Sequence, residues 1–297
     1  MKIFYGDKQT FVDITDTVFE KCKHLGQSGQ YIIPANDVRR AKIFGDPLYG
    51  VVKKIVIITD EKTQIFDHND EILITLPNTV SIIESPISKL NKIHKNLKFL
   101  GGRLTDELPE QLMVVKFLDP NSKVLELGSN IGRNTLVISS ILNNDSNLVT
   151  CESDVQICHD LEINKNINNM KFNIENSALS YRNLIQKGWD TIPSDTLLPG
   201  YKQVNTVTFE QLEEKYAITF DTLVVDCEGA LYYILKDKGD ILKNIKMVIM
   251  ENDYWEIEKK VFVDKMLESY NFGCIYREAG GWGPCFDYFF QVWKKNE

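Results

Sequence analysis

Short segments that combine acidic or polar side chains with glycine are the first candidates for chemistry in this chain. Each follows an apolar run that is typical of a buried strand. They are Glu126–Gly132 (ELGSNIG), Glu152 with Ser153, Asn176–Ala178 and Asp226–Gly229 (DCEG). Glycine lets a backbone turn sharply and approach a ligand closely, and the start of a helix offers unpaired N–H groups. Carboxylates accept hydroxyl hydrogens, remove protons or hold divalent cations.

The elements around these segments predict that they meet in space. Strands and helices alternate from residue 123 onward, which predicts a Rossmann-like, doubly wound α/β sheet, mostly parallel, with an antiparallel C-terminal strand. Ligands bind such sheets at the carboxyl ends of the strands, where these segments lie. We expect residues 181–200 to be irregular. The predicted strands cover residues 123–127, 148–151, 171–174, 203–206, 222–225, 246–250, 274–276 and 288–293, and helices cover 132–142, 155–165 and the residues after 208 and 229.

The first 84 residues predict a separate, small β-rich domain. Short apolar runs between turn residues predict strands near residues 2–5, 10–14, 31–33, 51–58, 64–66 and 72–76, with one helix at 17–24. No motif in this domain carries chemistry. It is either a dimerisation or substrate-presenting module, which would make the protein a homo-oligomer, or a packing extension. Residues 85–297 form the α/β domain, which begins with two linking helices over residues 85–120.

The composition disfavours several classes of protein. A formal net charge of −8 and a pI near 5.2 argue against a partner such as nucleic acid, whose phosphates need many cations. The six cysteines show no C-x-x-C spacing, so neither a zinc site nor a disulfide framework is indicated. No run approaches the roughly 18 apolar residues of a membrane-spanning helix, and the N-terminus lacks a signal-peptide pattern. We expect a cytoplasmic protein.

The turn after the first predicted strand of the α/β domain favours a cationic ligand over a dinucleotide. In the dinucleotide fingerprint G-x-G-x-x-G, Asn130 replaces the second glycine and Arg133 the third. Glu126 precedes the turn, where it would repel a pyrophosphate. S-adenosylmethionine carries a sulfonium and an ammonium group, which suit this acid. Taken alone, such a turn is equally typical of a plain connection between a strand and a helix, and Glu152 alone is typical of a solvated acid. Their joint placement at successive strand ends favours a cofactor site.

Four motifs, ELGSNIGRNT, CESD, NSALS and VVDCEGALYYIL, resemble those of the FkbM-type class I methyltransferases. The resemblance covers about residues 107–253. It implies an S-adenosylmethionine-dependent O-methyltransferase that acts on hydroxyls of sugars or other natural products. The N-terminal extension, with ELPEQ before the core, resembles that of FkbM relatives encoded by large DNA viruses. Val224 stands where the family usually has Lys, and Phe209–Glu210 replaces the usual Leu–Asp, so substrate handling can differ.

The resemblance also implies roles for individual residues. Positions 126, 128, 130 and 132 would line the methionine half of the cofactor, Glu152 would hold its ribose, positions 177 and 178 would flank its adenine, and Asp226 with Glu228 would face the reacting centre. Gln111 follows Glu107 and Glu110 at the start of the second linking helix, where such groups either face the ligand or only favour the helix dipole. The complete expected cofactor-binding set is Glu126, Gly128, Ser129, Asn130, Gly132, Glu152, Ser153, Asn176, Ser177, Ala178 and Gln111.

Transfer of a methyl group to a sugar hydroxyl requires removal of the hydroxyl proton, by a general base or with the help of a divalent cation. Asp226 and Glu228 are our candidates for either role, and the alternative for Asp226 is a structural helix cap. For the acceptor, Trp282 and Phe286 would stack on a sugar, and Asp253 or Asp287 would take its hydroxyls, unless the aromatic rings belong to a core or an interface. The histidines, His24, His68, His94 and His159, are expected at surface or packing positions.

Two other functions remain open from the sequence. The acceptor of the methyl group would be nucleic acid or protein in one of them. In the other, the chain would be a non-catalytic scaffold with a methyltransferase-like fold. The intact turn at 126–132 argues against a scaffold, because a scaffold needs no cofactor loop.

Overall fold

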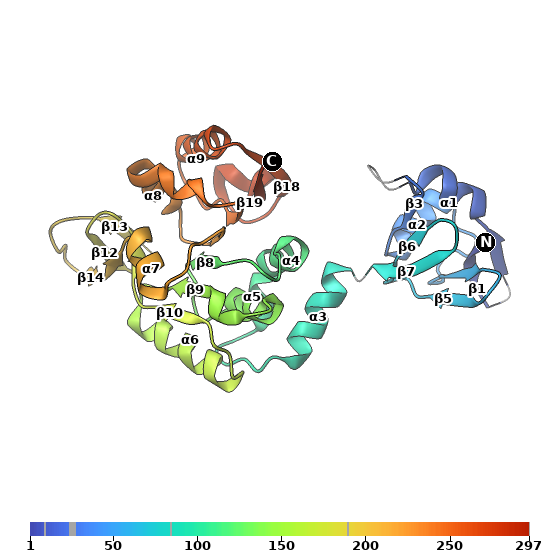
Figure 1. Ribbon diagram of the computed structural model, residues 1–297, viewed down its shortest axis with the longest axis horizontal. Coiled ribbons are helices and arrows are strands. Elements are labelled where there is room, and N and C mark those ends of the chain that lie inside the picture. The colour runs from blue at the N-terminus through green and yellow to red at the C-terminus, as the bar shows by residue number, and fades with distance from the viewer. Residues whose placement is uncertain (9, 24–27, 84, 189, 297) are drawn as a thin grey trace. The chain divides into compact units, whose positions relative to one another are not determined.

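The computed structural model describes residues 1–8, 10–23, 28–83, 85–188 and 190–296 (Figure 1). The chain divides into two compact units, Met1–Lys89 and Leu90–Glu297, and α3 (Pro86–Asn96) contains the boundary between them. Each unit has its own hydrophobic core. His24, one of the histidines considered above, lies outside the described residues.

The first unit is β-rich, as the sequence predicts. One antiparallel sheet has the order β2-β1-β4-β5 and another the order β3-β6-β7. Buried and exposed residues alternate along β1 and β4, so that Ile3, Tyr5, Ile55 and Ile57 share one core face. The strands are β1 (Lys2–Asp7), β2 (Thr10–Asp13), β3 (Gln30–Ile33), β4 (Lys54–Ile58), β5 (Thr63–Phe66), β6 (Glu71–Thr75) and β7 (Thr79–Ile83).

The prediction of a single helix in this unit was wrong. Besides α1 (Thr15–Lys21), the unit contains α2 (Asp37–Phe44). Asn36 caps α2, because its side chain accepts hydrogen bonds from the first backbone N–H groups of the helix. The strand β7 was also not predicted, since Val80 alone of its residues is buried and its apolar pattern is weak.

The second unit is built on a seven-stranded sheet with the order β10-β9-β8-β16-β17-β19-β18. All neighbours from β10 to β17 are parallel, whereas β19 runs antiparallel to both β17 and β18. This arrangement confirms the predicted fold class. The strands are β8 (Val124–Leu127), β9 (Leu148–Cys151), β10 (Asn173–Glu175), β16 (Thr222–Val225), β17 (Met247–Glu251), β18 (Phe272–Glu278) and β19 (Phe290–Lys295).

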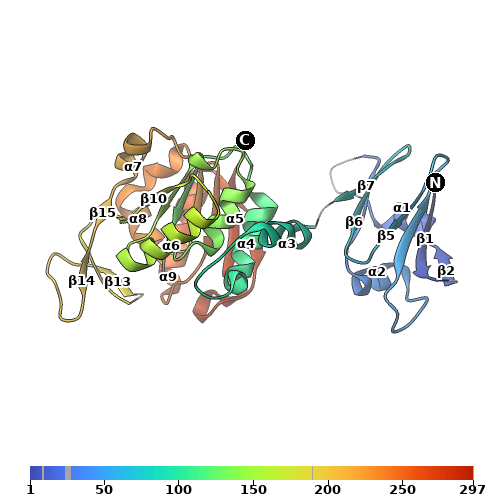
Figure 2. The same ribbon diagram turned by 90° about the horizontal axis from the view of Figure 1, so that it is seen from below.

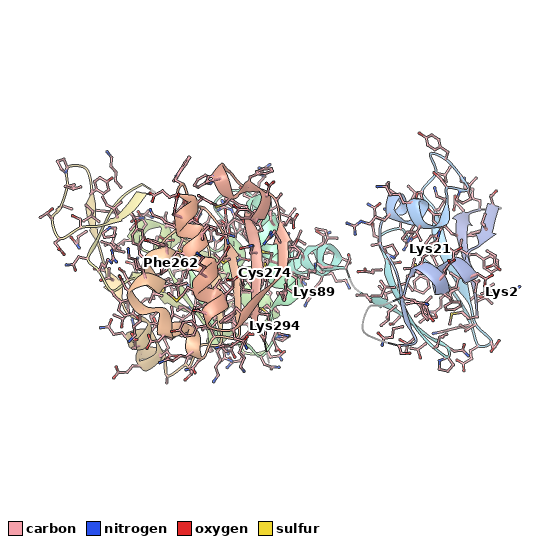
Figure 3. The ribbon with its side chains drawn as sticks, turned by 90° about the horizontal axis from the view of Figure 1, so that it is seen from above. Lys2, Lys21, Lys89, Phe262, Cys274 and Lys294 are labelled. Atoms are coloured by element: carbon pink, nitrogen blue, oxygen red, sulfur yellow. The ribbon has the colours of Figure 1, made fainter. Side chains whose placement is uncertain are left out.

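Helices cover both faces of this sheet, so every residue of β8, β9 and β16 is buried (Figure 2). α4 packs against α5 and α8 against α9, and Figure 3 shows α9, with Phe262, beside the strand that carries Cys274. Within the described parts of the chain, no helix is long and apolar enough to cross a membrane. The helices are α4 (Leu108–Phe117), α5 (Arg133–Ile141), α6 (Val155–Ile167), α7 (Phe209–Tyr216), α8 (Leu231–Lys238) and α9 (Ile257–Ser269).

The segment between β10 and α7 corrects the sequence-based prediction. Residues 181–200 are not irregular throughout, because β12 (Leu184–Lys187) and β13 (Asp190–Pro193) pair antiparallel and β14 (Lys202–Val204) joins β12 on its other side. The predicted strand at 203–206 therefore does not extend the central sheet. Its second part, β15 (Thr206–Val207), pairs with β11 (Ala178–Leu179). These strands have two to four residues and pair only among themselves, so no long apolar run marks them.

Candidate functional site

A cavity of about 340 Å³ lies at the carboxyl ends of β8, β9 and β16. This is the place at which doubly wound sheets bind ligands. Eight of the predicted residues line it, namely Gly128, Asn130, Glu152, Ser153, Ser177, Ala178, Asp226 and Glu228. The other predicted residues, Glu126, Ser129, Gly132, Asn176, Gln111, Asp253, Trp282 and Phe286, are not part of its lining.

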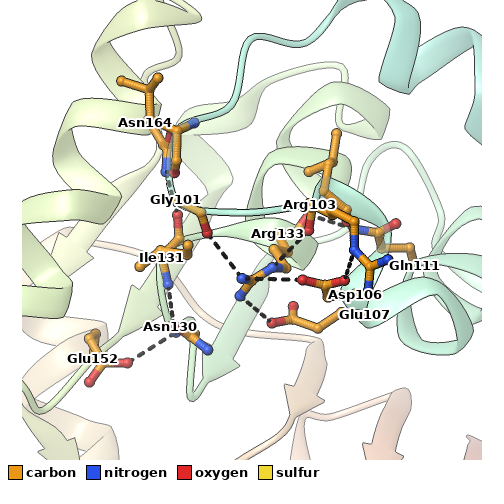
Figure 4. Close-up of polar contacts among 12 residues, drawn as sticks. Gly101, Arg103, Asp106, Glu107, Gln111, Asn130, Ile131, Arg133, Glu152 and Asn164 are labelled. Atoms are coloured by element: carbon orange, nitrogen blue, oxygen red, sulfur yellow. Dashed lines mark hydrogen bonds and ion pairs between the residues drawn. The ribbon is translucent and has the colours of Figure 1, made fainter.

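The Glu152 carboxylate is fixed in the cavity by backbone groups. Its Oε1 accepts a hydrogen bond from the N–H of Asp154 at 2.8 Å, and its Oε2 accepts one from the N–H of Asn130 at 3.0 Å (Figure 4). A carboxylate can accept about four hydrogen bonds, so these two leave capacity for a ligand. Burial raises the pKa of Glu152 above its usual value. The group is thus oriented to accept hydrogen bonds from a ligand such as a diol.

The turn after β8 requires left-handed backbone at three positions, Gly128, Asn130 and Gly132. A Cβ atom at residue 128 would lie 1.6 Å from the backbone oxygen of Asp226, and one at residue 132 would lie 2.5 Å from Cδ1 of Leu161. Both glycines are therefore required by contacts within the protein itself. We predicted that both glycines let the backbone approach a ligand. Only Gly128 lines the cavity, so this interpretation can apply to Gly128 and not to Gly132.

Glu126 is buried beneath the turn, outside the cavity lining. Its Oε2 accepts hydrogen bonds from the hydroxyl groups of Thr135 at 2.6 Å and Thr150 at 2.7 Å. Burial raises the pKa of Glu126 to about 7 despite these contacts. Glu126 thus connects α5 with β9. It does not line the cavity, so it could influence a ligand only through its charge and not by direct contact.

Gln111 has a positioning role. Its side chain is fully buried, and Nε2 donates hydrogen bonds to the carbonyl oxygens of Leu104 at 2.8 Å and Arg133 at 3.0 Å. Its Oε1 lies 2.9 Å from Nε2 of His94, which agrees with a packing position for this histidine. These contacts join α4 to the start of α5 and to α3.

Two residues that the sequence does not predict hold the loop before α4 against the turn (Figure 4). Arg133 donates hydrogen bonds to the carbonyl oxygens of Gly101 and Arg103, and its Nη1 lies 3.4 Å from Oε1 of Glu107. Asn164, fully buried in α6, donates to the carbonyl oxygen of Ile131 at 2.9 Å. In the sequence, Asn164 is only one polar residue within a predicted helix, so nothing there indicated its role.

Ser129 and Asn176 act on the backbone of the strand ends. The Ser129 hydroxyl donates to the carbonyl oxygen of Cys151 at 3.3 Å, and the Asn176 amide donates to the carbonyl oxygen of Glu152 at 2.9 Å. Both contacts hold the loop after β9, which presents Glu152 to the cavity. We therefore interpret these two residues as supports of the predicted site.

Carboxyl groups gather around the ends of β16 and β17. Burial and the nearby acids Asp253 and Glu107 raise the pKa of Asp226 well above its usual range. Burial, Asp226 and Glu110 raise the pKa of Glu251 to about 11. Neighbouring like charges disfavour ionisation of all these groups, and either protonation or a nearby positive charge would relieve the repulsion. Among the described residues, no set of three or more His, Cys, Asp or Glu side chains is arranged to hold a metal ion.

Asp253 supports the turn that carries Glu228. Its buried carboxylate accepts hydrogen bonds from the backbone N–H groups of Glu228 and Gly229, which both have positive φ. Burial and the charge of Glu228 raise the pKa of Asp253 to about 7. This acid therefore changes charge near neutral pH while in contact with a candidate catalytic residue.

Two tryptophans near the C-terminus, one exposed and one half-buried, form a pair that the sequence predicts only in part. The Trp282 ring centre lies 4.2 Å from that of Trp255, and Trp255 is 79% exposed. Trp255 follows the carboxyl end of β17, two residues after Asp253. Phe286 is also exposed. The pair thus stands at the same edge of the sheet as the carboxyl groups.

The remaining cavity wall was not predicted. It comes from the β12–β14 sheet, which the sequence-based analysis treats as irregular, and from Tyr233 and Ile234 of α8. The contributing residues of the sheet and of the segment before it are Arg182, Leu184, Gln186, Thr191 and Pro193.

No family model and no curated protein matches the chain. Similar solved structures include a protein of the NADB-Rossmann superfamily from Streptococcus agalactiae, with 14% identity and a TM-score of 0.42 over 67% of this chain and 71% of that one. The ribosomal protein L11 methylase from Lactobacillus delbrueckii subsp. bulgaricus has 10% identity and a TM-score of 0.43 over 67% and 82%. An O-methyltransferase from Bacillus cereus in complex with SAH has 14% identity and a TM-score of 0.39 over 74% and 93%. Similarity at this level carries no information on the reaction, so the function is argued from the site.

Replacement of Glu126 by Gln is expected to stabilise the protein at neutral pH. The folded-state pKa of Glu126, about 7, lies above its ordinary value of 4.5, so folding retains a proton that the unfolded chain releases. This stabilisation is complete below about pH 4.5 and is lost as the pH rises through about 7. The amide oxygen of Gln still accepts hydrogen bonds from Thr135 and Thr150 but carries no charge. The variant therefore avoids the loss of stability that ionisation of Glu126 causes above about pH 7, up to about 3 kcal/mol.

Urea denaturation at pH 5 and pH 8 measures this effect. The free energy of unfolding of Glu126→Gln, relative to the wild type, should be higher at pH 8 than at pH 5. Glu162→Gln, which changes an exposed acid on α6, is the control and should show no such difference. The same pH dependence in Glu126→Gln and the wild type would contradict the prediction.

Proposed function

We propose that this protein is an S-adenosylmethionine-dependent O-methyltransferase that acts on a hydroxyl of a sugar or glycan. The observation that carries the proposal is the placement of Glu152 and Asp226, from the ends of two strands on either side of β8, in one cavity. One acid can hold a diol, and the other stands among carboxyl groups that favour a cation. S-adenosylmethionine combines a ribose diol with a cationic sulfonium.

The residues of the cavity fit this cofactor. A volume of about 340 Å³ lies within the usual range of small-molecule sites. Glu152 would hold the ribose, and the small residues Ser177 and Ala178 leave room for a flat base between strand-end loops. Asp226 would stabilise the positive charge. A pyrophosphate fits less well, because Arg182, the cation of the lining, is already paired with Asp237 at 2.5 Å.

The surroundings of the carboxyl groups support a sugar as acceptor. Sugars bind proteins through stacking on aromatic faces and hydrogen bonds from hydroxyl groups to carboxylates. The exposed Trp255, stacked on the half-buried Trp282, offers such a face at the same sheet edge as Asp253 and Glu228. The same carboxyl groups would repel the phosphates of a nucleic acid. RNA or protein as acceptor is therefore the less favoured alternative.

The chain's own residues would align the acceptor and remove its proton. When bound, S-adenosylmethionine supplies a methyl group already activated on sulfur, so alignment is the main task of the protein. Asp226 and Glu228 are the candidate bases, since both line the cavity. A nearby positive charge lowers the pKa of Asp226 and so favours the ionised form that accepts a proton. Asp253 fixes the turn of Glu228 through backbone hydrogen bonds.

Replacement of Glu152 by Gln is expected to weaken binding of S-adenosylhomocysteine by about 10- to 100-fold, since a hydrogen-bonded charged acceptor is lost. Isothermal titration measures the dissociation constant. The 2′-deoxy analogue separates a ribose contact from a general effect, because it should bind worse than the parent to the wild type and equally well to Glu152→Gln. Glu162→Gln again serves as the control. No binding of S-adenosylhomocysteine or S-adenosylmethionine to the wild type would reject the proposed function.

The acceptor class is tested by mass spectrometry of glycan pools and of RNA incubated with isotope-labelled S-adenosylmethionine. We expect the label in glycans. Trp255→Ala should raise the KM for the acceptor and leave cofactor affinity unchanged, because Trp255 lies outside the lining of the proposed cofactor cavity. Label in RNA and none in glycans would replace a sugar with nucleic acid as the acceptor.

Replacement of Asp226 by Asn is expected to lower kcat by about 100-fold or more, the usual loss when a general base is removed. Affinity for the cationic S-adenosylmethionine should fall more than affinity for the neutral S-adenosylhomocysteine, since Asp226 stabilises the charge. Activity of the wild type should rise with pH as the base loses its proton, and Asp253→Asn, which removes a neighbouring charge that raises the pKa of Asp226, should move this rise to lower pH. Glu258→Gln, at an exposed position of α9, is the control. Full activity of Asp226→Asn would exclude Asp226 as the base.

A further inference from the structure

The small sheet between β11 and β15 forms one wall of the cavity. Residues two apart on a strand point to the same face, and two cross-strand pairs of β12 and β13, Leu184 with Pro193 and Gln186 with Thr191, all line the cavity. The face that these four residues share is therefore the one turned toward the ligand. This wall is separate from the loops that follow the strands of the central sheet.

The wall is anchored to α8 at its edge. Arg182 forms a two-bond ion pair with Asp237 of α8, with Nε at 2.6 Å from Oδ2 and Nη2 at 2.5 Å from Oδ1. The guanidinium group also lies 5.4 Å from the ring centre of Tyr233. Paired groups of this kind hold a fixed geometry. The segment that leads into the β12–β14 sheet is thus tied to α8, which also lines the cavity.

Gln186 is the unusual residue of this wall. Its side chain is 6% exposed, and its Oε1 has no hydrogen-bond partner within the described residues. β12 is the middle strand of the sheet, between β13 and β14, so the backbone of Gln186 is held from both sides. A buried acceptor without a donor is destabilising, and native proteins rarely keep one without a reason. Nothing in the proposed methyl transfer uses this residue.

The chemistry of the surroundings indicates the missing partner. Leu184, Pro193 and Ile234 make this part of the cavity apolar, which suits a flat heterocycle with few polar groups. A glutamine amide presents an acceptor beside a donor, and the edge of adenine presents an amino donor beside a ring-nitrogen acceptor. The two edges can form a pair of hydrogen bonds that satisfies Oε1. A carboxylate would be the more common partner for sugar hydroxyl groups.

We propose that Gln186 selects the adenine base of the cofactor, by accepting a hydrogen bond from its exocyclic amino group. This inference rests on the proposed function and assigns recognition of the base to the β12–β14 sheet. The loop residues Ser177 and Ala178 then only provide space for the ring.

The test compares S-adenosylhomocysteine with its analogue that lacks the amino group on the purine, by isothermal titration. The wild type should bind the parent about 10-fold more tightly, since the analogue leaves Oε1 unpartnered. Gln186→Leu should bind both ligands equally, and Gln186→Glu, which keeps an acceptor, should retain the preference. Gln203→Leu is the matched control, because Gln203 lies on β14 in the same sheet, does not line the cavity and contacts the wall only by donating to the carbonyl oxygen of Leu184 at 3.1 Å. This variant should keep the preference for the parent ligand.

Each other outcome overturns one of the two proposals. If the wild type binds S-adenosylhomocysteine and shows no preference for the amino group, or if Gln186→Leu keeps the preference, the inference about Gln186 is wrong and the proposed function stands. A change in the KM of the acceptor alone in Gln186→Leu would likewise assign Gln186 to the acceptor. If the wild type binds neither ligand, the proposed function fails first.

Discussion

The candidate site depends on the close contact between the turn after β8 and the end of β16. Because residue 128 has no side chain, the turn can lie against the backbone oxygen of Asp226, where a Cβ atom would be only 1.6 Å away. The same turn directs the N–H of Asn130 to Glu152, at the end of β9. One tight turn therefore ties three strand ends together. The cavity lies between the ends of β8, β9 and β16, which this turn holds in place.

The second constraint is electrostatic. Burial raises the pKa values of Asp226, Asp253, Glu251 and Glu110, and repulsion by neighbouring acids raises those of Asp226, Glu251 and Asp253 further. A bound cation relieves this repulsion and lowers those pKa values. Binding of a positively charged methyl donor and ionisation of the base are then linked, so that the base would gain its charge mainly when the donor is present. Cofactor binding would thus favour the ionised form of the base, which is the form that accepts the proton of the hydroxyl group.

The β12–β14 sheet gives the cavity a wall that the central sheet does not provide. The strand-end loops offer carboxylates and small residues, which suit the sugar and charge of a cofactor. The inserted sheet adds an apolar face and the buried amide of Gln186. If the strand-end loops and the β12–β14 sheet contact different parts of the ligand, the sheet could change in sequence without disturbing the turn after β8. The first unit, Met1–Lys89, has its own core, and our alternatives for its role as a dimerisation or substrate-presenting module remain proposals.

The sequence by itself determined the alternation of strands and helices in the central sheet and the strand-end segments of the site. Continuous apolar runs such as Leu148–Cys151 occur because both faces of the strand are buried, and this local signal identifies the strand, its end and the polar residue that follows. Glu152 and Asp226 could be placed in one cavity on this basis. The capping box that begins α7, formed by Thr208 and Gln211, is likewise a local feature of the sequence.

Only the tertiary structure decided which polar residues face the ligand. Glu126 and Gln111 have hydrogen-bond partners 7 to 24 residues away, which make these side chains structural supports, and no local pattern records those partners. The strands β12, β13 and β14 are too short to carry a periodic signal, and their pairing brings Gln186 into the cavity. The pairing of Trp255 with Trp282 joins the segment after β17 to the segment after β18. Contacts between distant segments depend on the whole fold, because the distances that separate such side chains are set by packing and not by spacing along the chain.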